Sequence, residues 1–283
     1  MPGTLYLVAT PIGNLEDITL RALRVLREVA VIAAEDTRHT AKLLAHHDIH
    51  TPTTSFYEQN ELERIPRLLQ RLAGGESVAL VTDAGTPGIS DPGYRLVKAA
   101  VEGGLKVEAV PGASAVLTAL VASGLPTNAF AFLGFPPPRA QARDRWLASL
   151  ATRQETVVFF EAPHRIRETL QAAARILGDR RVMVARELTK LHEELIRGRL
   201  TEIVGLMTEM RGEFTVVLAP SEAPAEGLPL PDDASLRDEF YRLTENPAVG
   251  RREAISALAE KYNVPSRQIY AAVERGRGDT PPS

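Results

Sequence analysis

The 283-residue sequence contains no cysteine, which excludes disulfide bonds, zinc sites with cysteine ligands and thiol catalysis. It also has no apolar run of the roughly 18–20 residues that a membrane span requires. No basic stretch followed by an apolar one, the pattern of a secretory signal, begins the chain. These absences together favour a cytoplasmic protein without a membrane partner.

Strong net charge is also absent. The formal net charge is −3, so the protein is not polycationic as a whole, and any contact with RNA or DNA must come from a local basic patch. The hydrophobic content of 44% and charged content of 24% are those of an ordinary globular protein. The length allows about two domains, each with its own core.

The first part of the chain alternates short apolar runs with amphipathic stretches. Strands are expected at 5–9, 31–34, 78–82 and 106–110, and helices at 15–29, 37–46, 60–73, 92–103 and 113–122. Because apolar β-branched runs separated by helices are typical of parallel sheets, this part is predicted to be an α/β domain covered by helices on both faces.

A second series of strands and helices follows. Strands are expected at 129–134, 155–160, 181–186 and 213–219, and helices at 139–150, 164–177 and 199–210. The predicted fold class is therefore α/β, with an N-terminal domain at 1–117 and a second α/β domain at 118–220. A stretch rich in proline and acidic residues, 221–233, is predicted to be a linker because it cannot form a core.

The remaining residues, 234–283, are predicted to form a small helical module. They contain three short helical patterns, and the turn between the last two resembles a helix-turn-helix. Between Asn246 and Gly278 there are six basic and three acidic residues, a net charge of +3. The module either binds RNA through this charge or only packs with a solvated charged face.

Four loops that follow predicted strands have the composition of a ligand site. They span residues 10–14, 34–38, 82–90 and 110–115, and they are rich in glycine, proline, serine and threonine. Ligands of open α/β sheets lie beyond the carboxyl ends of the strands. The first loop has one glycine where a GxGxxG turn has three, and none of the four carries a phosphate-binding lysine. Each loop alone is explained by a structural turn, but four together favour a neutral or zwitterionic ligand such as an adenosine–amino acid conjugate.

Seven sequence blocks occur in these loops and in the second domain: VATPIGNLEDITLRAL, AAEDTRHT, VTDAGTPGISDPG, VPGASA, FLGF, FFEAPHR and ARELTKLHEE. From residue 4 to about 219 they resemble the tetrapyrrole (corrin/porphyrin) methylase superfamily, and within it the enzymes that methylate RNA of the small ribosomal subunit. The resemblance implies that two α/β domains enclose S-adenosylmethionine in the cleft between them. It also implies a homodimer that methylates the ribose 2′-hydroxyl of a cytidine in the decoding region of 16S rRNA, with the 30S subunit as partner.

The resemblance also assigns cofactor contacts by motif. One wall is expected from Pro11, Ile12 and Gly13, and the opposite side from Asp83, Gly85, Thr86 and Ile89. The methionine end is expected at Ser114 and Ala115, and the adenine at Phe160 and Leu188. Relatives have Gly-Asp-Pro where this chain has Gly85-Thr86-Pro87, so Thr86 departs from the family pattern.

Methylation of a ribose hydroxyl requires a group that accepts its proton. The candidates are Glu35, Asp36, Glu187 and Lys190, with His192 and Glu193 nearby. The alternative is that Glu35 pairs with Arg38, and Arg186 with Glu187, as structural ions. Cations expected to hold RNA phosphates are Arg38, Arg165, Arg186 and Lys190, together with Arg251, Arg252 and Arg267 in the helical module.

No metal site is predicted. The histidines do not form a cluster with ligand spacing, and His46 and His47 are adjacent, so their side chains diverge on a helix.

Two other functions stay open at this point. One is a methylase of the same fold that acts on a tetrapyrrole or a protein side chain. The other is a non-enzymatic regulator that binds nucleic acid through the helix-turn-helix.

Overall fold

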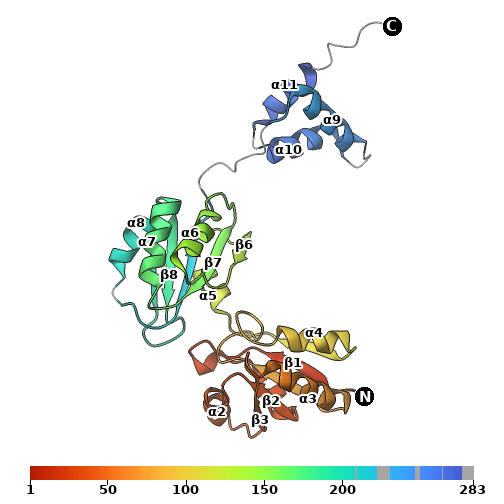
Figure 1. Cartoon of the computed structure of the whole chain (residues 1–283), viewed down its shortest axis with the longest axis vertical. Coiled ribbons are helices and arrows are strands. Elements are labelled where there is room, and N and C mark those ends of the chain that lie inside the picture. The colour runs from red at the N-terminus through yellow and green to blue at the C-terminus, as the bar shows by residue number, and fades with distance from the viewer. Residues whose placement is uncertain (208, 222–229, 246–248, 263, 276–283) are drawn as a thin grey trace.

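The apolar runs of the first domain form a five-stranded parallel sheet in the computed structural model, which describes residues 1–207, 209–221, 230–245, 249–262 and 264–275 (Figure 1). Its strands are β1 (Thr4–Val8), β2 (Val31–Ala34), β3 (Thr53–Ser55), β4 (Val78–Val81) and β5 (Lys106–Val110), in the order β3-β2-β4-β1-β5. Every residue of β2 and β4 is buried, as expected for central strands covered on both faces.

The helices of this domain are η1 (Leu15–Asp17), α1 (Leu20–Glu28), α2 (Thr37–His46), α3 (Glu61–Ala73) and α4 (Tyr94–Glu102). They bury two apolar clusters, one containing Leu26 and Ile32 and the other containing Phe56 and Leu80. The single helix predicted for 15–29 is interrupted, because Thr19 is in an extended conformation and its side chain accepts the Ala22 N–H as the N-cap of α1.

The second domain contains a five-stranded mixed sheet. Its elements are α5 (Ala115–Ala122), β6 (Phe130–Phe132), α6 (Ala140–Ala148), β7 (Thr156–Glu161), α7 (Ile166–Leu177), β8 (Arg181–Arg186), β9 (Glu194–Arg199), α8 (Leu200–Leu206) and β10 (Phe214–Leu218). The strand order is β6-β7-β10-β8-β9; β6 and β7 are parallel, and the other neighbours are antiparallel. The main core of this domain lies between the sheet and α6, α7 and α8.

Helix α5 packs on the second sheet, although it directly follows the last strand of the first. Its Val116, Ala119 and Leu120 share an apolar cluster with Val158 of β7 and Val217 of β10. The predicted boundary at residue 117 falls inside this helix. These contacts place α5 with the second domain, so we place the boundary just before Ala115.

The three helical patterns near the carboxyl end form α9 (Asp233–Thr244), α10 (Arg251–Lys261) and α11 (Ser266–Arg275). Their shared core contains Leu236, Phe240, Leu258, Ile269 and Val273. Most of the predicted linker, residues 222–229, lies outside the described residues. Within the described part of the chain, no helix has the length and apolarity needed to cross a membrane.

Candidate active site

A cavity of about 420 Å³ lies between the two α/β domains, beyond the carboxyl ends of β1, β4 and β5. Most of the predicted cofactor residues line it: Ile12, Gly85, Thr86, Ile89, Ser114, Ala115, Phe160 and Leu188. The other three, Pro11, Gly13 and Asp83, line a neighbouring cavity of about 180 Å³. Both cavities include Ile12, Ala84 and Glu213, so they are adjacent.

The loops after β1 and β4 are tied together by backbone hydrogen bonds. The Thr10 N–H donates to the Gly85 carbonyl at 2.9 Å, and the Gly85 N–H donates to the Thr10 carbonyl at 3.1 Å. Gly85 has a φ of +82°, a conformation that favours glycine. This conformation explains why the loop after β4 needs glycine at position 85. The backbone pairing of the two loops also fixes one side of the larger cavity.

The amino end of α5 forms another side of this cavity. Ser114 is the N-cap, and its hydroxyl accepts the Leu117 N–H at 3.4 Å. Ser114, Ala115 and Val116 all line the cavity. The free N–H groups and the dipole of a helix start favour an anionic group, so a carboxylate of a ligand fits here.

The second domain contributes an aromatic wall. Phe160 lies near the end of β7. Its ring centre is 4.8 Å from that of Phe132 and 5.6 Å from that of Phe135. Both ring pairs meet edge to face, and Phe135 is 52% exposed. Phe135, Phe160, Leu188 and Phe214 give the cavity an apolar surface suited to a planar heterocycle, and Phe132 supports Phe160 from behind the lining.

The carboxylates of Glu35, Asp83 and Asp91 gather near the end of β4. The Thr82 hydroxyl donates to Glu35 Oε2 at 2.7 Å, and the Asp36 N–H donates to Asp83 Oδ1 at 3.1 Å. Burial raises the pKa of Asp91 to about 6, with a further contribution from the negative charges of Glu35 and Asp83. Burial likewise raises the pKa of Asp83.

Asp91 was not among the predicted site residues, although it lines the larger cavity. The signal for it was a carboxylate inside the Gly/Pro-rich loop that follows β4, since such loops bring side chains to a ligand. Glu213, which borders both cavities, was also missed. It lies just before β10, in a segment that carries no recognisable motif.

Asp36 serves as the N-cap of α2. Its carboxylate accepts the Arg38 N–H at 2.8 Å and the Arg38 guanidinium at 2.8 and 3.1 Å. The hydrogen bonds from Arg38 hold the pKa of Asp36 well below its usual range. Asp36 is therefore a poor proton acceptor, and the partner of Arg38 is Asp36 instead of the predicted Glu35.

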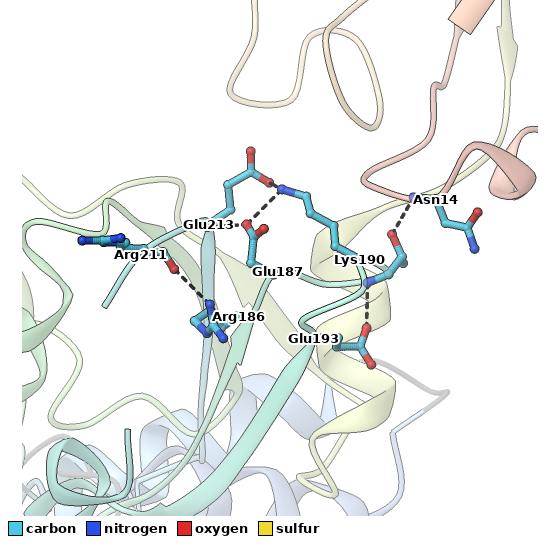
Figure 2. A network of polar contacts seen from close by, with 8 residues as sticks. Asn14, Arg186, Glu187, Lys190, Glu193, Arg211 and Glu213 are labelled. Carbon is cyan, nitrogen blue, oxygen red and sulfur yellow. Dashed lines mark hydrogen bonds and ion pairs between the residues drawn. The ribbon is translucent and has the colours of Figure 1, made fainter. Parts of the chain in front are cut away.

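Lys190 lies between two carboxylates in the network drawn in Figure 2. Its Nζ is 2.9 Å from Glu187 Oε1 and 3.0 Å from Glu213 Oε2. The Glu213 N–H also donates to Glu187 Oε1 at 3.0 Å. Burial by itself would lower the pKa of Lys190 and raise that of Glu187. The hydrogen bonds between these groups outweigh burial, so the pKa of Lys190 is raised and that of Glu187 is lowered. Both side chains therefore stay charged, and neither is a good proton acceptor in this state.

The loop that carries Glu187 and Lys190 has unusual backbone geometry and touches the first domain. Glu187 and Thr189 have φ angles of +53° and +65°. The Asn14 N–H donates to Thr189 Oγ1 at 3.0 Å (Figure 2). A Cβ on Gly13 would lie 2.5 Å from Lys190 Cγ, so only glycine allows this approach of the two domains.

Two of the arginines predicted to bind RNA are mostly buried ion-pair partners. Arg165 pairs with Glu161 at 2.6 Å, and its side chain is 15% exposed. Arg186 pairs with Glu194 at 2.6 Å, not with the predicted Glu187, and is 12% exposed. This placement favours a structural role for both residues over direct contact with phosphates. By contrast, the Arg38 side chain is 88% exposed.

Across the described residues, no group of three or more histidine, cysteine, aspartate or glutamate side chains has an arrangement that could hold a metal ion. The rings of His46 and His47 pack edge to face with centres 4.7 Å apart.

Residues 4–204 match the family model of the tetrapyrrole (corrin/porphyrin) methylases, and the chain belongs to this family. It is therefore an S-adenosylmethionine-dependent methyltransferase built from two α/β domains. Within the family it belongs with the proteins called ribosomal RNA small subunit methyltransferase I. It is 46% identical to the one from Synechocystis over 95% of this chain and 96% of the relative. It is 52% identical to the one from Micromonospora olivasterospora over 96% of this chain and 86% of the relative.

Solved structures show the same fold. One is uroporphyrin-III C-methyltransferase from Thermus thermophilus complexed with S-adenosylhomocysteine, with a TM-score of 0.55, 23% identity and coverage of 77% of this chain and 97% of that one.

Proposed function

We propose that this protein transfers the methyl group of S-adenosylmethionine to the ribose 2′-hydroxyl of a cytidine in the decoding region of 16S rRNA, acting on the small ribosomal subunit. The observation that carries the proposal is the cavity between the domains, which is lined by three of the four predicted loops, 10–14, 82–90 and 110–115, together with residues of the second domain. The name of the relatives, which cover nearly the whole chain, supports ribosomal RNA of the small subunit as substrate.

The residues around the larger cavity fit S-adenosylmethionine. The amino end of α5 at Ser114 suits the methionine carboxylate, and the aromatic wall at Phe160 suits the adenine. The carboxylates of Asp91 and Glu213 on the lining favour the positive charges of the sulfonium and the amino group. The demethylated cofactor seen in the structure of the Thermus relative supports the same assignment.

When bound, the cofactor supplies an electrophilic methyl group on a neutral leaving group, so alignment of the acceptor oxygen accounts for much of the rate. The chain must still accept the hydroxyl proton. We assign the role of proton acceptor to Asp91, because burial raises its pKa to about 6 and it lines the cavity. Asp36, Glu187 and Lys190 are less suited because their hydrogen bonds favour the charged form in each case.

The smaller cavity is suited to the nucleotide that carries the hydroxyl. It adjoins the cofactor cavity, and its lining includes Thr10, His39, Thr82 and Lys190. Lys190 is held as an ammonium group by its two carboxylates, so it can contact a phosphate or a ribose oxygen without losing its position. The exposed Arg38 lies at the start of α2, the helix whose His39 and Thr40 border the same cavity.

A homodimer is part of the proposal. Leu117 and Val121, one turn apart on α5, are 51% and 73% exposed. Exposed apolar side chains grouped in this way are typical of an interface between subunits.

The decisive experiment incubates the purified protein and labelled S-adenosylmethionine with 30S subunits from cells that lack the corresponding gene. The expected result is one labelled nucleotide in the decoding region, a cytidine whose 3′ phosphodiester resists alkali because the ribose 2′-oxygen is methylated. Label on a base, on a ribosomal protein, or on no component would contradict the proposal. Calorimetry of cofactor binding after exhaustive chelation is expected to give unchanged affinity, as a metal-free site requires.

A further inference from the structure

A groove lies on the helical module, separate from the cavities between the α/β domains. Its volume is about 450 Å³, and its lining residues come from α10 and α11: Arg251, Arg252, Ile255, Ser266, Arg267 and Tyr270. Three guanidinium groups and one aromatic ring thus border a single depression. None of the methylase motifs lies in this segment.

The basic residues of the module differ in whether they form ion pairs within it. Lys261 pairs with Glu239, and Arg275 pairs with Asp233 at 2.9 Å, so both contribute to packing of the three helices. Arg252 and Arg267 are exposed, and neither forms an ion pair or hydrogen bond with the described residues. Both of these arginines border the groove, so their charges are available to a partner that binds there.

Tyr270 is 51% exposed and is held from one side. Arg251 lies over its ring with Cζ 5.9 Å from the ring centre, and over Phe240 at 5.6 Å. Arg251 is itself fixed by its ion pair with Glu274. A half-exposed ring supported in this way can stack on a flat partner with little loss of side-chain entropy.

We propose that this groove binds single-stranded RNA, with one base stacked on Tyr270 and adjacent phosphates held by Arg252 and Arg267. Positive charge next to an exposed aromatic ring is the combination that single-stranded nucleic acids require. A duplex keeps its bases stacked inside and offers no free face to the ring. The choice of RNA as the nucleic acid rests on the proposed function, whereas the groove itself does not.

The test measures binding of the full chain to a fluorescently labelled ten-nucleotide RNA by anisotropy, at several salt concentrations. Tyr270→Ala is expected to weaken binding by about fivefold or more, the usual range for loss of one stacked base, whereas Tyr270→Phe keeps the ring and the affinity. Arg252→Ala with Arg267→Ala is expected to reduce the salt slope by about 1.4, or about 0.7 for each lost phosphate contact.

Two controls define the negative result. Tyr241→Ala removes a ring of similar exposure, 48%, from α9 outside the groove, and Lys98→Ala with Lys106→Ala removes two surface charges from the first domain. Equal losses in the groove and control variants, or equal binding of single-stranded and duplex RNA, would overturn the proposal. Binding of an acidic peptide in preference to RNA would do so as well.

Cofactor affinity and methyl transfer to 30S subunits are measured on the same variants. Loss of oligonucleotide binding with normal cofactor affinity is expected for the groove variants. If wild-type protein binds the oligonucleotide through the groove but methylates no RNA, the proposed function fails while the groove proposal stands. If the wild-type protein methylates RNA but the groove variants bind the oligonucleotide normally, the groove proposal fails while the proposed function stands.

Discussion

At the scale of single residues, Asp91 combines burial with two like-charged neighbours. Its carboxyl group has a raised pKa of about 6, so it is largely ionised at neutral pH and still basic enough to take a proton. The ionised form is the less favoured one in this environment. The same arrangement that prepares the group for catalysis therefore lowers the stability of the folded protein at neutral pH.

For Asp91→Asn we expect kcat to fall by about 10²–10⁴-fold, well beyond any loss of cofactor affinity caused by the missing negative charge. The wild-type rate should rise with pH through about 6 and then level off, and this rise should disappear in the variant. Because the folded pKa is raised, the contribution of Asp91 to stability is present below its unfolded pKa and is lost as pH rises through about 6. Asn should therefore raise the Tm at pH 7.5 but not at pH 4.

Asp48→Asn is the matched control for that change, because Asp48 is an exposed carboxylate that lines neither cavity. It should alter neither the pH profile nor the rate. A normal kcat for Asp91→Asn, with the rise near pH 6 intact, would transfer the role of proton acceptor to another group.

Ser114 offers a steric test of the cofactor site. Ser114→Trp should abolish binding of S-adenosylmethionine in calorimetry while circular dichroism stays that of the folded protein, because the indole would enter the cavity at the start of α5. Leu20→Trp adds the same side chain at a position that is 86% exposed and should bind cofactor normally. Normal binding by Ser114→Trp would mean that the cofactor lies elsewhere.

At this scale the sequence predicted which loop residues border the two cavities, but it did not predict the ionic partners. Gly85 and Ser114 stand in turns that directly follow strands, and parallel strands bring such turns to one edge. The partner of Arg186 is Glu194, which becomes a neighbour only through pairing of β8 with β9. The sequence pointed to Glu187 because it is adjacent to Arg186 in the chain. The true partner depends on strand register, which the local sequence does not give.

At the scale of elements, the segment from Glu187 to Lys190 is held in place by the turn before β10. Gly212 has a φ of +95°, and a Cβ there would lie 2.5 Å from Glu187 Oε1. The absence of a side chain at Gly212 thus leaves space for the Glu187 carboxylate, and this carboxylate positions Lys190 through their ion pair. Sequence periodicity predicted neither this turn nor β9.

For Gly212→Ala we expect a loss of about 2 kcal/mol or more of unfolding free energy, because the methyl group would meet Glu187 and alanine disfavours this φ. Displacement of Lys190 should also raise KM for 30S subunits. Gly205→Ala is the control: Gly205 lies within α8, and a Cβ added there would meet open space, so alanine should leave stability unchanged or raise it by up to about 1 kcal/mol. Equal denaturation midpoints for the two variants would contradict the role given to Gly212.

The elements that the sequence missed share a physical reason. β3 consists of Thr53, Thr54 and Ser55 at the sheet edge, and β9 reads ELIRGR, so neither has the continuous apolar run of a central strand. Edge strands bury little, and their position is decided by the neighbouring strand. The central strands were predictable because they are buried on both faces.

At the scale of the whole molecule, the α/β domains and the helical module have separate cores, so we expect them to be separable. Truncation after Ser221 should leave cofactor affinity and the Tm of the α/β domains unchanged, raise KM for 30S subunits and flatten its salt dependence. Calorimetry and a salt titration of the methylation rate test this. An unchanged salt slope together with a lower Tm would instead assign the module a packing role.

The dimer is tested at the same scale. Val121→Asp places a charge on the exposed apolar face of α5, and sedimentation should then show a monomer where the wild-type protein sediments as a dimer. Lys42→Asp, at an exposed position on α2, should not change the sedimentation. A wild-type monomer would remove the dimer from the proposed function.

The hydrogen bond from the Asn14 amide to Thr189 Oγ1 joins a loop of each α/β domain across 175 positions of the chain. Separation of the domains must break it, and the amide proton then becomes accessible to solvent. Hydrogen exchange at this one amide therefore counts openings of the cleft. The exchange rate of the Asn14 amide should fall when a ligand bridges the two domains. Exchange at this amide would therefore measure cofactor entry and product escape without any RNA.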